Sequence, residues 1–221
     1  MSAAVPPVLE EKIPSTGRLM ATLGLAGLLS GLILVGAHVF TLPIITANKA
    51  EALRRAVFEV VPESGRMQPL RWTGSELTAS EGEGPVVYAA YGADGAFRGY
   101  AVRGEGPGFQ DTIALLFGFD PGTRKIVGLW ILQSRETPGL GDKIFKDERW
   151  VNAFRDLAAE PEVVATKDGA EAPNEVDAIT GATISSKAVA RIVNAAMGEW
   201  LSRLPEPGSE PALGGGSGGG S

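Results

Sequence analysis

The longest apolar segment of the 221-residue chain lies near its N-terminus. No charged residue occurs between Leu19 and Asn48, and Leu19–Phe40 is almost wholly apolar. About 20 apolar residues are enough for a helix to cross a bilayer, whereas the apolar core of a cleavable signal peptide has roughly 7–15. The pattern predicts an uncleaved transmembrane helix over residues 19–42 after a short N-terminal segment, residues 1–18. A buried core helix is the alternative interpretation.

The basic residues around this segment leave its orientation open. Lys12 and Arg18 precede it, and Lys49, Arg54 and Arg55 follow it. Loops on the cytoplasmic side of a membrane carry the excess of Lys and Arg, and the two sides are here nearly balanced.

Beyond the apolar segment the pattern alternates between helical and extended spacing. Asn48–Val61 has apolar residues four apart and ends at Pro62, which predicts a helix. Short apolar runs separated by turn residues then predict four strands: Val86–Tyr91, Gly99–Arg103, Ile113–Phe119 and Ile126–Gln133. Asp120-Pro-Gly122 predicts a hairpin turn between the last two.

Two amphipathic helices are expected after the strands. They are Asp147–Leu157 and Ser185–Leu204, separated by a loop over residues 159–174 that is rich in acids, Gly and Pro. Strands followed by helices around one core predict the α+β class, with an antiparallel-type sheet flanked by helices over residues 43–206. Residues 207–221 are expected to be a flexible tail, and Gly214–Ser221 (GGGSGGGS) is typical of an artificial linker.

Composition excludes several kinds of chemistry. The chain has no cysteine, so iron–sulfur clusters, zinc-thiolate sites and disulfides are excluded, and one histidine cannot supply a bis-histidine haem site. Because these metal sites are excluded, any redox chemistry must use an organic cofactor. A net charge of −6 also argues against nucleic acid as a partner.

The first loop with possible chemistry is Glu136–Gly141 (ETPGLG), directly after a predicted strand. One proline and two glycines within four residues force a tight, exposed turn, whose amides can bond a planar ligand. An ordinary strand-to-helix connection explains the same pattern.

The second loop, Asp177–Ser186 (DAITGATISS), leads directly into the last predicted helix. Hydroxyl residues and glycine at a helix start are typical of N-capping. The same free amides, at the positive end of the helix dipole, also suit a phosphate. Spacing alone leaves both interpretations open.

The second loop resembles the flavinylation motif of the FMN-binding domain family, Asp-x-x-Ser/Thr-Gly-Ala-Thr. Asp177, Thr180, Gly181 and Ala182 match the earlier positions of that motif. The resemblance implies that the last threonine, Thr183, carries FMN through a phosphoester bond. It also implies that a separate flavin transferase, which reads the acidic residue Asp177, takes this FMN from FAD.

The chain also resembles one branch of that family, the G subunits of Rnf complexes. The likeness covers the apolar segment, the NKAEAL helix, Gly106-Pro-Gly-Phe-Gln-Asp111 and ETPGLGDKI (Glu136–Ile144). It implies a bacterial inner-membrane ferredoxin:NAD oxidoreductase that couples electron flow to ion translocation, with the A, D, E, B and C subunits of Rnf as partners and this domain in the periplasm. The C subunit of the sodium-translocating NADH:quinone oxidoreductase shares the threonine motif and the TPGLG loop, but it is usually longer.

The resemblance assigns roles around the implied FMN. Amides near Ile184 and Ser185 would stabilise its phosphate, while Leu140 and the amides of Gly139 and Gly141 would meet its ring. Thr137 would bond a ring carbonyl. Glu136 would either contact the ring, where its charge would disfavour an anionic reduced flavin, or only cap the helix after Gly141; the ring contact is the favoured interpretation.

Function follows as an expectation. No GxGxxG follows a strand, so no nicotinamide site is indicated. A tethered flavin without a substrate site of its own is expected to relay electrons one at a time between partner subunits. The alternatives are a non-redox, membrane-anchored sensor or binding module, which would be colourless, and an independent flavoenzyme with a soluble substrate.

Overall fold

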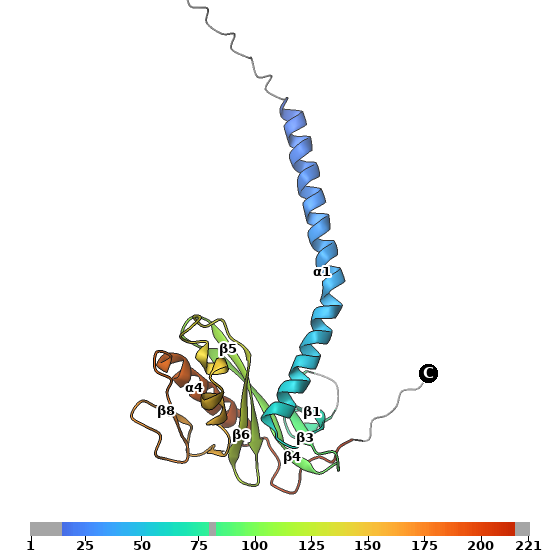
Figure 1. Cartoon of the computed structure of the whole chain (residues 1–221). Coiled ribbons are helices and arrows are strands. Elements are labelled where there is room, and N and C mark those ends of the chain that lie inside the picture. Colours follow the sequence, from blue (N-terminus) through green and yellow to red (C-terminus); the bar gives the residue numbers. More distant parts are fainter. Residues whose placement is uncertain (1–14, 80–82, 215–221) are drawn as a thin grey trace, which may run out of the picture. The chain divides into compact units, whose positions relative to one another are not determined.

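The computed structural model describes residues 15–79 and 83–214 of the chain (Figure 1). The chain divides into two compact units after Ala50. Helix α1 runs from Thr16 to Val60 and contains Pro43. The sequence predicts two separate helices here; helical conformation instead continues through residues 43–47, which include no glycine. The N-terminal part of α1 is long and apolar enough to cross a membrane, with a mean hydropathy of 2.1 in its most apolar window.

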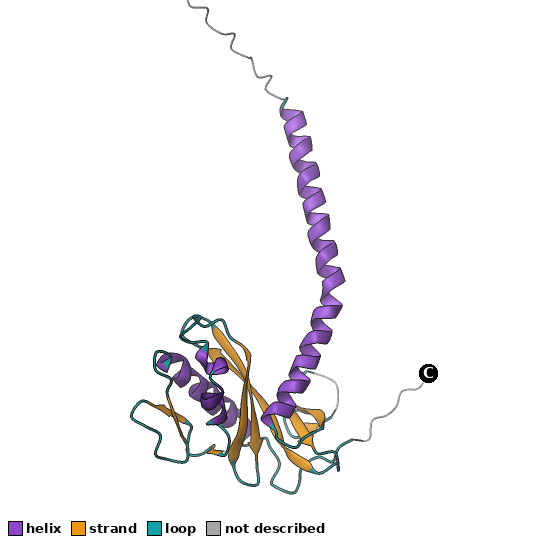
Figure 2. Ribbon diagram, in the orientation of Figure 1, coloured by secondary structure: helices purple, strands orange, loops and turns teal. Residues whose placement is uncertain are grey.

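The second unit is built around one antiparallel sheet (Figure 2). Within the described residues it has seven strands in the order β2-β1-β3-β4-β5-β6-β7. These are β1 (Arg66–Trp72), β2 (Leu77–Thr78), β3 (Val86–Tyr91), β4 (Phe97–Pro107), β5 (Thr112–Asp120), β6 (Lys125–Gln133) and β7 (Leu157–Ala158). A separate parallel pair is formed by β8 (Val164–Thr166) and β9 (Glu175–Asp177). The α+β class with an antiparallel sheet and flanking helices is confirmed.

Both faces of the sheet are covered by helices. The larger core lies between the sheet and helices α3 (Glu148–Asn152) and α4 (Thr183–Trp200), with the short α2 (Lys143–Lys146) beside α3. Side chains on β5 alternate as a strand requires: Ile113, Leu115 and Phe117 enter this core, whereas Leu116 enters a smaller one on the opposite face.

The smaller core holds the last turns of α1 against the sheet. Val57 and Val60 pack there against Ala101 and Leu116. Gly118 of β5 makes this possible, because a Cβ atom on it would collide with the carbonyl oxygen of Val60. The last turns of α1, which the sequence predicts as part of a separate helix, thus belong to the second unit.

Two elements differ from the sequence-based expectation. The helix predicted over Asp147–Leu157 ends at Asn152, and Asp156 has a positive φ of 65° before the chain enters β7. The acidic loop over residues 159–174 contains β8. Strands β7 and β8 are too short to show an alternating hydrophobic pattern. Each is defined by its pairing with another strand, β7 with β6 and β8 with β9.

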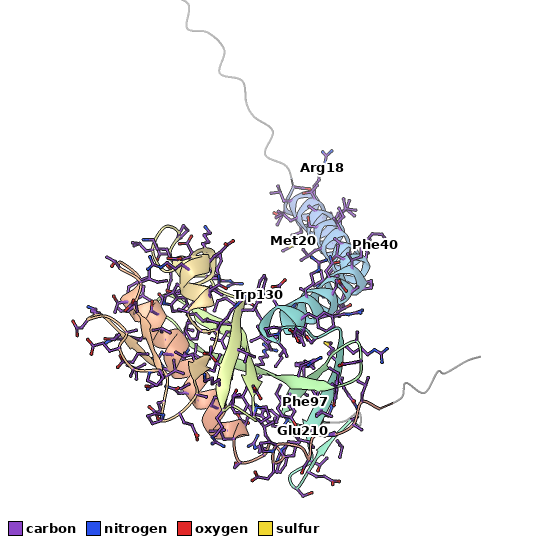
Figure 3. The ribbon with its side chains drawn as sticks, turned by 60° about the horizontal axis from the view of Figure 1, so that its bottom comes forward. Arg18, Met20, Phe40, Phe97, Trp130 and Glu210 are labelled. Carbon is purple, nitrogen blue, oxygen red and sulfur yellow. The ribbon has the colours of Figure 1, made fainter. Side chains whose placement is uncertain are left out.

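The segment after α4 makes contacts with the sheet. The Tyr91 hydroxyl donates a hydrogen bond to the carbonyl oxygen of Pro211, and the Gly214 amide donates one to Gln68 Oε1 at 2.9 Å. Glu210 of this segment and Phe97 of β4 are labelled in Figure 3. Residues 1–14 of the predicted N-terminal segment and 215–221 of the predicted linker lie outside the described residues.

Candidate functional site

The two loops singled out from the sequence meet at one pocket of about 330 Å³. The first loop contributes Thr137, Leu140 and Gly141, and the second contributes the five residues from Gly181 to Ser185. A third segment, the turn between β4 and β5, contributes Phe109. Segments far apart in the sequence therefore share one concave surface.

The rim of the pocket is apolar and open to solvent. Phe109 is 64% exposed, Leu140 is 50% exposed and Ile184 is 59% exposed. Large apolar side chains gathered around a pocket mark a ligand or interaction site rather than ordinary surface. A flat apolar ring system would cover these side chains.

Thr183 stands at the wall of this pocket as the first residue of α4. The N-cap is Ala182, which has no side-chain hydrogen bond, so the capping interpretation of the sequence does not apply to Thr183. Within the described residues the Thr183 hydroxyl makes no hydrogen bond. Amides of the first helical turn lack intrahelical acceptors, so an unbonded hydroxyl and free amides lie together at the pocket.

Ser186, in contrast, organises the loop before the helix. Its hydroxyl donates to the carbonyl oxygen of Ala182 at 3.0 Å and accepts from the amide of Ile179 at 3.1 Å. Gly181 has a positive φ of 84°, which a residue with a side chain rarely adopts. The loop thus reaches α4 in a fixed conformation that leaves Thr183 at the pocket.

Glu136, at the start of the first loop, is hydrogen-bonded to the other two segments of the pocket. Its Oε1 accepts from the amides of Phe109 at 2.9 Å and Gln110 at 3.0 Å, and its Oε2 accepts from the Ser185 hydroxyl at 2.5 Å. The residue is only 5% exposed. It is therefore a buried link between the β4–β5 turn, the first loop and α4.

The environment keeps Glu136 ionised. Burial alone raises the pKa of its carboxyl group, but the hydrogen bonds from Ser185 and from the backbone of residues 109–111 outweigh burial and hold the pKa below its ordinary value. The ionised Glu136 carboxylate is thus hydrogen-bonded directly to two residues that line the pocket, Phe109 and Ser185.

Two glycines leave room for this carboxylate. A Cβ atom on Gly141 would lie 2.6 Å from Glu136 Oε2 and 2.9 Å from Ser185 Oγ. A Cβ on Gly108 would collide with Glu136 Oε1 and would lie 2.8 Å from the carbonyl oxygen of Asp111. Neither position tolerates a side chain while the carboxylate keeps its contacts.

The remaining predicted residues lie at varying distances from the pocket. Thr137 lines it, with its hydroxyl donating to Gln110 Oε1 at 2.7 Å. Gly139 forms the turn with a φ of 78° and is not among the lining residues. Asp177 and Thr180 lie on a neighbouring surface that includes Lys143, where the Asp177 carboxylate accepts from the Ala170 amide at 2.7 Å.

Sequence reasoning missed Phe109, the side chain of Ile184 and the role of Gly108. The signal for the first was available, because the Gly106–Asp111 segment places an aromatic residue between polar and glycine neighbours in a turn. Nothing in the sequence shows that this turn lies against the other two loops.

The residues of the pocket fit FMN. The hydroxyl and free amides at the start of α4 suit a phosphoester, and the apolar rim beside them suits a flavin ring. The pocket is open, so the ring would be only partly enclosed, and a covalent bond would then retain it.

Comparison with known proteins indicates the same cofactor. A family model described as FMN-binding domain matches residues 108–198. The G subunit of the ion-translocating oxidoreductase complex from Methanosarcina acetivorans is 34% identical over 149 residues, covering 67% of this chain and 75% of that protein. The G subunit of the Na⁺-translocating ferredoxin:NAD⁺ oxidoreductase complex from Acetobacterium woodii is 34% identical over 152 residues, covering 67% and 70%.

Solved structures support the fold. The crystal structure of NqrC from Shewanella oneidensis matches with a TM-score of 0.56 and 17% identity, covering 67% of this chain and 91% of that one. The C subunit of the Na⁺-translocating NADH-quinone reductase from Parabacteroides distasonis matches with a TM-score of 0.56 and 19% identity, covering 71% and 94%. The fold is thus shared with a C subunit of that reductase, whereas the relatives by sequence are G subunits. The chain therefore belongs to the family of G subunits of ion-translocating oxidoreductase complexes, the Rnf G subunits, and contains their FMN-binding domain.

Proposed function

We propose that this chain is the electron-carrying subunit of an ion-translocating ferredoxin:NAD oxidoreductase (Rnf) complex, with FMN attached to Thr183. The observation that carries the proposal is the Thr183 hydroxyl, which lies without a hydrogen-bond partner among the described residues, at a helix start and on the wall of an apolar-rimmed pocket. The complex is inferred from the names of the similar proteins, which are G subunits of ion-translocating oxidoreductase complexes.

Attachment requires a nucleophile and a leaving group. The Thr183 oxygen attacks the FMN phosphorus of FAD, so that a new P–O bond forms as the pyrophosphate bond breaks. AMP leaves, and the hydroxyl proton passes to a base of the flavin transferase. The start of α4 stabilises the resulting phosphoester anion through its amides and dipole.

When bound, FMN supplies a redox centre that accepts and releases electrons one at a time. The chain's own residues hold it and cover part of its ring. Leu140, Phe109 and Ile184 provide apolar contacts, and Thr137 lies where its side chain can meet a polar ring edge. Asp177 and Thr180, on the neighbouring surface, are assigned to recognition by the transferase.

The proposed arrangement in the membrane follows the chain. Residues 19–42 anchor the protein in the bacterial inner membrane, residues 1–18 are cytoplasmic and residues 43–206 form the periplasmic FMN-binding domain. The apolar part of α1 supports the anchor. The A, D and E subunits of Rnf are the proposed membrane partners, and its B and C subunits carry the remaining redox centres of the complex.

Activity of the complex tests the function. Thr183→Val keeps the shape of the side chain but removes the nucleophile, so ferredoxin-dependent NAD reduction in membranes should fall to background while the variant chain remains assembled. Thr112→Val, an exposed threonine on β5, is the matched control and should retain activity. Full activity in Thr183→Val would exclude the relay.

Orientation is tested separately, because the chain has no cysteine. Asp168→Cys, in the exposed loop after β8, should react with a membrane-impermeant maleimide in spheroplasts. Ser2→Cys should react only after permeabilisation. The opposite labelling pattern would reverse the proposed topology.

A further inference from the structure

Glu136 has a more specific position than either role expected from the sequence. It is not among the residues that line the pocket. Its carboxylate instead accepts hydrogen bonds from Phe109, Gln110 and Ser185. It does not cap the helix after Gly141, since the N-cap of α2 is Asp142.

The charge of this carboxylate is fixed close to the attachment point. Ser185, which donates to Oε2 at 2.5 Å, lies two residues after Thr183 on the same first turn of α4. The two flanking glycines, Gly108 and Gly141, let the chain approach the carboxylate closely. The side chain is buried, so solvent screens its charge poorly.

We propose that Glu136 is a positioning residue that fixes the β4–β5 turn and the start of α4 around the cofactor, and that its charge lowers the one-electron reduction potential of the bound FMN. This inference rests on the proposed function. Adding an electron near a fixed, poorly screened anion is less favourable than adding it near a neutral group. The same carboxylate thus affects both the shape of the pocket and the reduction potential of the bound FMN.

Two substitutions separate charge from position. Glu136→Gln keeps an oxygen that can accept from the two amides and a terminal group that can pair with the Ser185 hydroxyl, but it removes the charge. Ser185→Ala keeps the charge but removes the bond that ties it to α4. Asp120→Asn is the matched control, because Asp120 also accepts from one amide and one hydroxyl, at the β5–β6 hairpin.

The experiment uses the full chain in detergent, produced together with a flavin transferase. Intact mass gives the fraction of chain that carries FMN, a redox titration gives the midpoint potential, and thermal denaturation reports folding. Glu136→Gln should shift the midpoint potential to a more positive value. Ser185→Ala should reduce the initial rate of FMN attachment several-fold without a positive shift in potential. Asp120→Asn should match wild type in both.

The outcomes are distinguishable. An unchanged potential in folded, flavinylated Glu136→Gln would overturn the electrostatic role, and an unchanged attachment rate in Ser185→Ala would overturn the positioning role. If Glu136→Gln does not fold, Ser185→Ala decides both roles. An unchanged attachment rate would overturn the positioning role, and a positive shift of its midpoint potential would overturn the electrostatic role, because this variant keeps the charge. Wild-type chain without FMN would reject the proposed function itself.

Discussion

The hydroxyl of Ser185 donates a 2.5 Å hydrogen bond to the carboxylate of Glu136, which is 49 residues earlier in the chain. This contact joins the first turn of α4 to the loop that follows β6. The turn that carries Thr183 is therefore held by tertiary contacts and not by a capping side chain of its own. Changes at this link are expected to affect the whole pocket.

Gly141→Ala should destabilise the protein. Its new methyl group would lie 2.6 Å from Glu136 Oε2 and 2.8 Å from Glu136 Cβ, both buried and fixed by hydrogen bonds. Overpacking of this kind costs about 1–3 kcal/mol of unfolding free energy, which urea denaturation measures.

Gly198→Ala is the control for that substitution. Gly198 lies inside α4 with nothing near the site of a Cβ atom, so alanine should stabilise the helix by about 0.5–1 kcal/mol. If both variants shifted stability equally, the close approach at Gly141 would not matter.

Acid should weaken the fold through Glu136. Its folded-state pKa lies below the ordinary glutamate value, so the folded state binds fewer protons than the unfolded state between those two values. The contribution is complete above the unfolded pKa of about 4.3 and is lost as the pH falls through the folded-state pKa.

Comparison with Glu136→Gln isolates this contribution, since other carboxylates titrate alike in both proteins. The difference in unfolding free energy between wild type and variant should shrink as the pH falls from 6 to 3, an interval chosen to bracket about 4.3. A difference that stays constant or grows would contradict an ionised, hydrogen-bonded Glu136.

Tyr91→Phe should lower stability by about 0.5–1.5 kcal/mol, the usual net value of a hydrogen bond. The Tyr91 hydroxyl donates to the carbonyl oxygen of Pro211, which connects the sheet to the segment after α4. Tyr88→Phe is the control, because Tyr88 on the same strand makes no hydrogen bond through its hydroxyl within the described residues. Equal stability of the two variants would mean that the segment does not contribute.

Phe109→Ala should change the cofactor environment with little effect on folding. Phe109 is 64% exposed, so its loss should alter the stability of the flavin-free protein by less than about 0.5 kcal/mol. In flavinylated protein the ring should become more accessible, seen as stronger quenching of flavin fluorescence by iodide.

Phe145→Ala provides the comparison for flavin exposure. Phe145 on α2 is also partly exposed, but it does not line the pocket. Iodide quenching in this variant should equal that of wild type, and equal quenching in Phe109→Ala would remove Phe109 from the flavin site.

Elements with strong local periodicity can be predicted from the sequence. The runs predicted over Val86–Tyr91, Ile113–Phe119 and Ile126–Gln133 correspond to β3, β5 and β6. Strand β1 escapes prediction, because Arg66–Trp72 mixes polar residues with Pro69 and gains its strand conformation from pairing with β3. Local patterns cannot report such pairing.

The same limit applies to the site. Both loops can be identified from the sequence as candidate ligand-binding loops, because their glycine, proline and hydroxyl residues are close together in the chain. The role of Glu136 cannot be predicted in this way, since its partners are 26 to 49 residues away and only the folded chain brings them together. Phe109 is missed for the same reason, because its turn between β4 and β5 meets the other two loops only in the folded chain.

Intact mass of the purified full chain, produced with a flavin transferase, tests the central claim most directly. Wild type and Thr183→Ser, which keeps a hydroxyl, should gain the mass of one FMN less one water, and Thr183→Val should not. Fluorescence in a denaturing gel should follow the same pattern. An unmodified wild type, or a Thr183→Val chain that still carries the added mass, would contradict attachment at Thr183.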